Sequence, residues 1–347
     1  MAMTISDIAR LAGVSRATVS GVLNQSPAVG EKTKAKVLAI IAEHNYKPNE
    51  VARALARKQT GMIGLLVKDI SNPLYSQIAL GVEQACAERG YSVIMGNTHK
   101  EHEREIANIN LLKRRRVDGL IIFPLQKGSD LGHIYDLATE NYPFVLLAEV
   151  SGVDADLVRA DDETGAFAAT EHFIRLGKQR IAYITGPKSA LASDRRLQGY
   201  RRALVKHQIS PKDEWVFNGG WRIEHGYHAG QAMLESSDDK PDGVFCYNDS
   251  VAIGFIRAMN EAGVQVPRDM GVIGVDDSRV SAYLETALTT VAQPAHEIGS
   301  KAMDLLWRRI QNRNQSISTR QIFLPTQLIV RETCGANPKG TVRISVP

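Results

Sequence analysis

The sequence lacks the features that define several large classes of protein. Its three cysteines, Cys86, Cys246 and Cys334, form no CxxC pair and no even-numbered framework, which favours free thiols in a reducing compartment. No apolar run is long enough to span a membrane, and the first residues lack the basic and apolar regions of a secretion signal. We therefore expect a cytoplasmic protein that makes no membrane contact.

Catalytic and metal-binding motifs are also missing. The sequence contains no GxSxG, GxGxxG or P-loop, and His296-Glu297 is not completed to HExxH because position 300 is serine. The histidines and glutamates of residues 99–103 lie in a strongly polar stretch that is typical of a helix start rather than of a metal site. The sequence thus predicts no enzymatic activity, no cofactor and no metal site.

The composition is that of an ordinary globular protein, but the charge is unevenly distributed. The chain has 347 residues, 44% hydrophobic and 23% charged, which is enough for two or three domains with a large core. Residues 1–60 hold nine basic and four acidic side chains, a net charge of +5, whereas the whole chain carries only +4. A basic segment on a near-neutral body suggests that the segment binds nucleic acid.

Residues 4–43 carry the pattern of three short helices. Thr4 to Asp7 has the spacing of a capping box, Gly13 supplies a turn, and Ser15 is a suitable N-cap for the second helix. Helical spacing predicts that the inner positions are Ile5, Ile8, Leu11, Ala12, Val19, Val22, Leu23, Val37, Leu38, Ile41 and Ala42. This layout predicts a helix-turn-helix, and a three-helix bundle that binds a protein is the alternative.

In a helix-turn-helix the second helix enters the major groove with its N-terminal residues against the base edges. We expect its outward positions to be Arg16, Ala17, Ser20 and Gly21. Arg16 can reach guanine in a bidentate manner, and Thr18 and Ser20 suit phosphate or base contacts.

The run from Thr4 to Asn24, TISDIARLAGVSRATVSGVLN, resembles the signature of the LacI/GalR family of repressors over its whole length. The resemblance implies a sequence-specific regulator that binds a palindromic double-stranded operator. It also implies that Arg16, Ala17 and the position of Gly21 select the operator. The DNA-contacting positions expected in this segment are Thr4, Ser15, Arg16, Ala17, Thr18, Ser20 and Asn24.

Residues 46–56, YKPNEVARALA, form the next segment, in which Pro48 is a good start for a helix that is too short to be stable alone. The family resemblance implies a hinge helix that orders on the operator, paired with a second copy in the minor groove. Leu55 would then wedge between base pairs, supported by Asn49, Ala52 and Arg53. A plain linker is the alternative.

From Met62 onward, short apolar runs alternate with helical patterns. The expected strands are 62–67, 91–95, 119–123, 144–147, 180–184, 243–247 and 271–275. This repeat predicts an α/β core of two doubly wound lobes, and the resemblance implies that the core is periplasmic-binding-protein-like. Ligands in such folds bind at the carboxyl ends of the strands.

Several polar and aromatic residues lie where such a ligand would bind, although each has a structural alternative as a helix cap or core residue. Asn248 and Asp276 follow predicted strands, and Trp221 offers an apolar face for a sugar ring. Arg196 has a planar guanidinium group that can donate paired hydrogen bonds to hydroxyl or carboxylate groups. The resemblance implies an effector site formed by Tyr75, Phe123, Asp161, Arg196, Trp221, Asn248, Asp276 and Gln293. For Asp161 and Asp162, the sequence leaves open whether each binds the ligand or caps a helix.

The expected domain boundaries follow from these patterns. Residues 1–47 form the helix-turn-helix domain, 48–60 the hinge and 61–334 the effector-binding core, with a tail at 335–347. Within the core we expect lobe one at 61–160 and 293–318, and lobe two at 161–290 and 319–334. The tail has no leucine heptad, so a homodimer is expected rather than a coiled-coil tetramer.

The predicted function is transcriptional repression controlled allosterically by a small molecule, a sugar or sugar derivative. The segment 60–69 is most similar to maltose-type sugar regulators. A transport-type binding protein and a sugar-modifying enzyme are the rival hypotheses, and the sequence leaves open whether the effector releases DNA or promotes its binding. The basic run 113–116 is either a solvated helix end or a second DNA contact.

Overall fold

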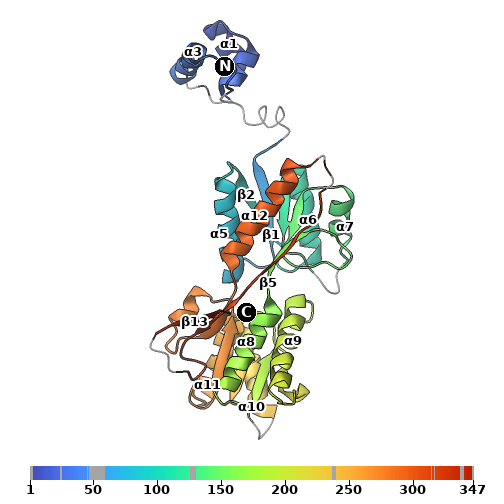
Figure 1. Ribbon diagram of the computed structural model, residues 1–347, viewed down its shortest axis with the longest axis vertical. Helices are drawn as coiled ribbons and strands as arrows, with labels where there is room; N and C mark the ends of the chain where they lie inside the picture. The colour runs from blue at the N-terminus through green and yellow to red at the C-terminus, as the bar shows by residue number, and fades with distance from the viewer. Residues whose placement is uncertain are drawn as a thin grey trace. The chain divides into compact units, whose positions relative to one another are not determined.

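The computed structural model describes residues 3–23, 26–44, 46, 59–125, 130–236, 240–313, 315, 317–336 and 340–345. The chain divides into two compact units, residues 1–60 and residues 61–347 (Figure 1). None of the helices within the described ranges is long and apolar enough to cross a membrane.

The first unit contains three helices, α1 (Ile5–Ala12), α2 (Arg16–Leu23) and α3 (Glu31–Glu43). The predicted capping box is confirmed, because the Thr4 side chain accepts from the Asp7 backbone N–H and the Asp7 carboxylate accepts from that of Thr4. Gly13 closes α1 with a φ of 65°, which glycine adopts without strain. A small core of Ile8, Ala9, Ala12, Val19, Val22 and Val37 holds the helices together.

Four positions of this unit differ from the sequence-based expectation. Leu11 and Leu38 were expected inside but are 48% and 45% exposed, and Ala42 is exposed too. Gly21 was expected to face outward, yet a Cβ there would lie 2.9 Å from Val29, so this position faces the loop after α2. Helices this short bury only a narrow stripe, which is why positions at its edge are hard to assign from spacing alone.

The first lobe of the core is a six-stranded sheet with strand order β11-β5-β4-β3-β1-β2 and parallel pairing throughout. Alternate residues of β1 face opposite sides: Leu65 packs in the cluster that includes α5 and α12, and Leu66 in the cluster that includes α6 and α7. Figure 1 shows α12 beside α5. The elements are β1 (Met62–Val67), α5 (Pro73–Ala87), β2 (Ser92–Asn97), α6 (His102–Arg114), β3 (Gly119–Ile122), α7 (Gly132–Thr139), β4 (Phe144–Leu146), β5 (Asp156–Ala160), α12 (Ala295–Gln311) and β11 (Gln321–Leu324).

The second lobe is a seven-stranded sheet with strand order β13-β12-β10-β9-β8-β6-β7. Helices α8 and α9 supply residues to the hydrophobic cluster on one face, and α10 and α11 to the cluster on the other. The elements are α8 (Asp162–Arg175), β6 (Ile181–Ile184), α9 (Leu191–Lys206), η1 (Asp213–Trp215), β7 (Val216–Phe217), α10 (Ile223–Ser236), β8 (Gly243–Cys246), α11 (Asp249–Glu261), β9 (Gly271–Val275), η2 (Arg279–Ala282), β10 (Thr289–Ala292), β12 (Gln327–Val330) and β13 (Val342–Ser345).

The chain crosses between the lobes three times: after β5, after β10 and after β11. The expected assignment of residues 319–334 to the second lobe is wrong for β11, which pairs with β5 and so completes the first sheet. The segment 335–347, expected to be a tail, contains β13, which pairs antiparallel with β12. In both cases backbone pairing, with the distant strand β5 for β11 and with the preceding strand β12 for β13, decides the lobe.

Candidate functional site

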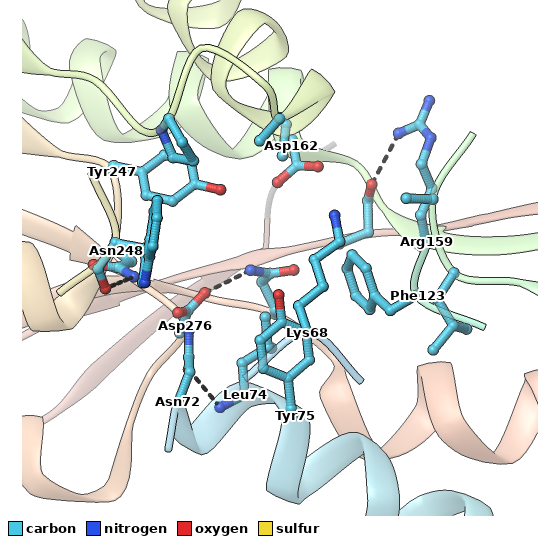
Figure 2. A pocket seen from close by; sticks show the side chains of 18 of the residues that line it. Lys68, Asn72, Leu74, Tyr75, Phe123, Arg159, Asp162, Tyr247, Asn248 and Asp276 are labelled. Carbon is cyan, nitrogen blue, oxygen red and sulfur yellow. Dashed lines mark hydrogen bonds between the residues drawn. The ribbon is translucent and has the colours of Figure 1, made fainter. Parts of the chain in front are cut away.

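A cavity of about 250 Å³ lies at the carboxyl ends of the strands and is lined from both lobes (Figure 2). Lys68, Tyr75, Lys100 and Phe123 come from the first lobe, and Asp162, Arg196, Trp221, Tyr247, Asn248 and Asp276 from the second. This is where an open parallel sheet brings polar loop residues together, because all strands of such a sheet end on one edge.

The aromatic part of the cavity has apolar faces suited to a ring-shaped ligand. The Tyr75 and Phe123 rings meet edge to face, with centroids 5.1 Å apart and planes at 88°. Trp221 and Tyr247 line the cavity from the second lobe, and Figure 2 shows Tyr247 across the space from Tyr75. Aromatic faces of this kind pack against the C–H faces of a sugar or against a planar base.

Arg196 is the centre of the second-lobe wall. Its Nε and Nη2 donate to Oδ1 of Asp162 at 2.9 and 2.7 Å, and its Nη1 donates to the Tyr247 carbonyl oxygen. Its guanidinium lies over the Tyr247 ring, 4.6 Å from the centroid. Both partners of the ion pair are buried, with side chains 5% and 9% exposed. The guanidinium is therefore held rigidly in place before any ligand arrives.

Asn248 is both a helix cap and a wall residue. Its Oδ1 accepts from the Val251 backbone N–H at 2.9 Å and so caps α11, while its Nδ2 donates to the Trp221 carbonyl oxygen at 3.1 Å. One amide therefore fixes the start of α11 and ties down the loop that carries Trp221, and its contact with an effector stays a prediction.

Asp276 directly follows β9 and has a φ of 112°, a conformation that costs free energy for any residue with a Cβ. Its Oδ1 accepts from Gln293 Nε2 at 2.6 Å, at the second crossing between the lobes. Burial raises the pKa of this carboxyl to about 7, against the opposing effect of Arg196. Near neutral pH, Asp276 can therefore either donate or accept a proton in a hydrogen bond.

The first-lobe wall carries two lysines that no ion pair among the described residues neutralises. Lys68 Nζ lies 4.8 Å from the centroid of the Phe123 ring, and Lys100 Nζ lies 3.3 Å from that of Trp221. Burial lowers the pKa of Lys68 to about 8 and that of Lys100 to about 7. Neither lysine was singled out from the sequence.

Glu149 joins the two lobes at the side of the cavity. It lies between β4 and β5, and its Oε1 accepts from Arg159 Nε at 3.1 Å in the same lobe. Its Oε2 accepts from Arg195 on α9 of the second lobe. The contact of Lys100 with Trp221 also spans the lobes, so two separate charged contacts bridge the cavity mouth.

The structure brings seven of the eight expected effector residues to this cavity, namely Tyr75, Phe123, Arg196, Trp221, Asn248, Asp276 and Gln293. Asp161 is the correction: its carboxylate accepts from the Thr164 backbone N–H at 3.1 Å and caps α8, and it does not line the cavity. Asp162, the first residue of the helix, lines the cavity instead. Whether these residues bind an effector stays a prediction.

The described residues expected to contact DNA lie on or next to α1 and α2. Arg16 and Ala17 are exposed at the start of α2, whereas Thr4 and Ser15 are engaged in the N-terminal caps of α1 and α2. Thr18 and Ser20 are partly buried, and the Thr18 hydroxyl lies 2.9 Å from that of Ser15. The remaining DNA-contacting positions, Asn24, Asn49, Ala52, Arg53 and Leu55, lie outside the described residues.

The fold and the cavity define a class: a small helical unit with a helix-turn-helix layout joined to a two-lobed α/β core built to enclose a small ligand. Comparison with known proteins agrees. The family model for "Bacterial regulatory proteins, lacI family" matches residues 4–49, and that for "Periplasmic binding protein-like domain" matches residues 170–334.

Three relatives illustrate the match. The ribose operon repressor of Escherichia coli (strain K12) is 38% identical over 311 residues, 88% of this chain and 93% of that protein. A Lac repressor dimer bound to operator and the anti-inducer ONPF is 32% identical, with a TM-score of 0.85, covering 97% of this chain and 100% of that one. A complex of the regulator CelR with cellobiose is 32% identical, with a TM-score of 0.72, covering 95% and 99%.

The chain belongs to the LacI family of transcriptional regulators. It is a repressor of this family with a DNA-binding helix-turn-helix and an effector-binding core. The family consists of DNA-binding regulators rather than enzymes.

Proposed function

We propose that this repressor acts as a homodimer in the bacterial cytoplasm, binds a palindromic operator, and changes its operator affinity when a sugar or sugar derivative occupies the cavity between its lobes. One observation carries the proposal: the cavity is lined from both lobes and bridged by the contacts of Glu149 with Arg195 and of Lys100 with Trp221. A ligand there touches both lobes, so its binding free energy depends on how they are arranged.

Such a dependence is sufficient for allosteric control. A ligand that binds one lobe arrangement more tightly shifts the population toward it. By linkage, the factor by which the ligand changes operator affinity equals the factor by which the operator changes ligand affinity. The relatives' names include ribose and cellobiose, so the proposal names the ligand class and not one sugar.

On the DNA side, we propose that Arg16 and Ala17 read base edges, because they are exposed at the start of α2. The hinge hypothesis for residues 48–60, with Leu55 as the wedge, rests on the sequence resemblance alone. The proposed working division is residues 1–47 for DNA binding, 48–60 for the hinge, and the rest for effector binding and dimerisation.

The test is operator selection from a random pool of DNA duplexes with the purified full-length protein. We expect a palindrome with half-sites about one helical turn apart. Arg16→Ala should lose the consensus, whereas Arg257→Ala, which removes an exposed arginine from α11, should recover the same palindrome. Recovery of no consensus by the unmodified protein, with and without a mixture of sugars, would refute the proposal.

A further inference from the structure

The cavity holds more positive charge than recognition of a neutral sugar requires. Among the described residues, five cationic side chains line it, Lys68, Lys100, Arg159, Arg195 and Arg196, against two carboxylates, Asp162 and Asp276. Arg196 is paired with Asp162, and Arg159 and Arg195 share Glu149. These pairs leave the first-lobe lysines as the cations without a bonded counter-charge.

The nearby carboxylates form no direct ion pair with either lysine among the described residues, and their oxygens are hydrogen-bonded to other groups. Glu105 is the acidic group that acts on Lys68, but its oxygens lie 2.7 Å from His133 Nε2 and 2.9 Å from the Leu125 backbone nitrogen. Asp69 acts on Lys100, but its Oδ1 accepts from the Ser71 hydroxyl and backbone N–H. Lys68 and Arg222 oppose the charging of Lys100, so the cluster is short of negative charge.

The backbone adds to the positive potential at the same edge of the sheet. Lys68 follows β1 and Lys100 follows β2, and helices α5 and α6 begin a few residues after them. Helix N-termini carry partial positive charge and favour anions. Asn72, the N-cap of α5, and Leu74 in its first turn both line the cavity.

A buried ammonium without a counter-ion is costly, so one that lines a ligand cavity points to a ligand that supplies the missing charge. We infer that the effector of this repressor is an anionic sugar, with a phosphoryl or carboxylate group bound by Lys68 and Lys100 and its hydroxyl groups bound by the Arg196 wall. This inference rests on the proposed effector site and narrows its ligand class.

The first test uses inorganic phosphate as the probe and thermal unfolding of the full-length protein, with sodium chloride at equal ionic strength as the reference. We expect phosphate to raise the Tm, and the Lys68→Met/Lys100→Met double variant to lose that shift and to bind phosphate at least about tenfold more weakly. Methionine keeps an apolar stem against Phe123 and Trp221, so the variant is designed to preserve packing.

The matched control is Lys212→Met. Lys212 Nζ also lies over an aromatic ring, 4.7 Å from the Trp215 centroid, but it does not line the cavity. This variant should keep the full phosphate shift, which separates site binding from the general stabilisation that phosphate gives to folded proteins. An equal shift in the unmodified protein and the double variant would overturn the inference.

Calorimetric titration with matched pairs then identifies the anionic group: ribose against ribose 5-phosphate, and glucose against gluconate. Tighter binding of ribose 5-phosphate assigns a phosphoryl group, and tighter binding of gluconate a carboxylate. If a neutral sugar releases the operator and binds as tightly as its anionic partner, the inference that the effector is anionic is refuted. The proposed function is then upheld. If phosphate raises the Tm but the protein selects no operator, the anion site is upheld and the proposed function is refuted.

Discussion

The two walls of the cavity are built on opposite principles. On the second-lobe wall, the charged and amide groups Arg196, Asp162, Asn248 and Asp276 all have bonded partners within the protein. On the first-lobe wall, Lys68 and Lys100 lie against aromatic faces and have no bonded carboxylate among the described residues. The first arrangement is held by bonds within the protein, whereas the second leaves two cations without a bonded counter-charge among the described residues, which is costly. Removing a cation should therefore have opposite effects on the two walls.

The largest effect is expected on the second-lobe wall. Arg196→Ala leaves the Asp162 carboxylate buried without its partner, which should lower the free energy of unfolding by about 3–5 kcal/mol. Denaturant titration measures this loss. The same variant should lose its ligand response and keep operator binding, because residues 1–60 form a separate compact unit. An undiminished ligand response would contradict the role assigned to this wall.

The same kind of deletion on the other wall should stabilise the protein. Lys68→Met removes a buried charge whose pKa burial lowers from 10.5 to about 8, and it should raise the free energy of unfolding by about 1–3 kcal/mol at neutral pH. A lowered folded-state pKa means that the burial penalty is complete below pH 8 and disappears as the pH rises past 10.5. The stability gained by Lys68→Met should therefore shrink as the pH rises. A variant less stable than the unmodified protein at pH 7 would contradict the difference between the two walls.

Asn248 separates the structural and positioning parts of the second-lobe wall. Asn248→Ala removes the N-cap of α11 and should cost about 1 kcal/mol. Asn248→Ser retains a cap oxygen but loses the donor to the Trp221 carbonyl oxygen, so it should keep most of the stability and weaken ligand binding. Denaturant titration and calorimetry on both variants measure the two parts. Equal stability loss in both would assign the whole effect to the loop that carries Trp221.

The smallest effect concerns Asp276, where Arg196, Asp249, Asp162 and Gln293 face the carboxyl group. Because burial raises its folded-state pKa from 3.8 to about 7, stability should fall as the pH rises from about 4 to 7 and should level off above 7. Asp276→Asn removes the titration and should flatten the slope of Tm between about pH 5 and 7. A slope equal to that of the unmodified protein would show that other groups dominate this range.

Much of the second-lobe wall could be predicted from sequence because its residues follow from local rules. Asn248 and Asp276 come directly after apolar runs that were correctly predicted as the strands now seen as β8 and β9. The capping box of Thr4 and Asp7 is equally local, since its spacing alone determines its hydrogen bonds. Structural features that lie within a few residues of a clear strand or helix-cap pattern can therefore be predicted from the sequence.

The first-lobe wall could not be found in this way. Lys68 also follows a predicted strand, but lysine at a strand end is usually solvated, and its burial depends on Phe123 from another strand. Lys100 becomes informative only through Trp221 of the opposite lobe. Likewise, the apolar pattern of β11 does not say which sheet it joins, because only its pairing with β5 decides that. Such features depend on tertiary contacts.

The interleaving of the two lobes limits how recombination between related genes can exchange them. β11 lies late in the chain, yet it completes the sheet that begins with β1, and β12 and β13 complete the sheet that begins with β6. No uninterrupted stretch of gene therefore encodes one lobe. A single recombination breakpoint between β5 and β11 would pair a β5 from one parent with a β11 from another. Exchange of an intact lobe between relatives requires several breakpoints at once, so the two walls of the cavity, and the ligand specificity they share, are inherited together.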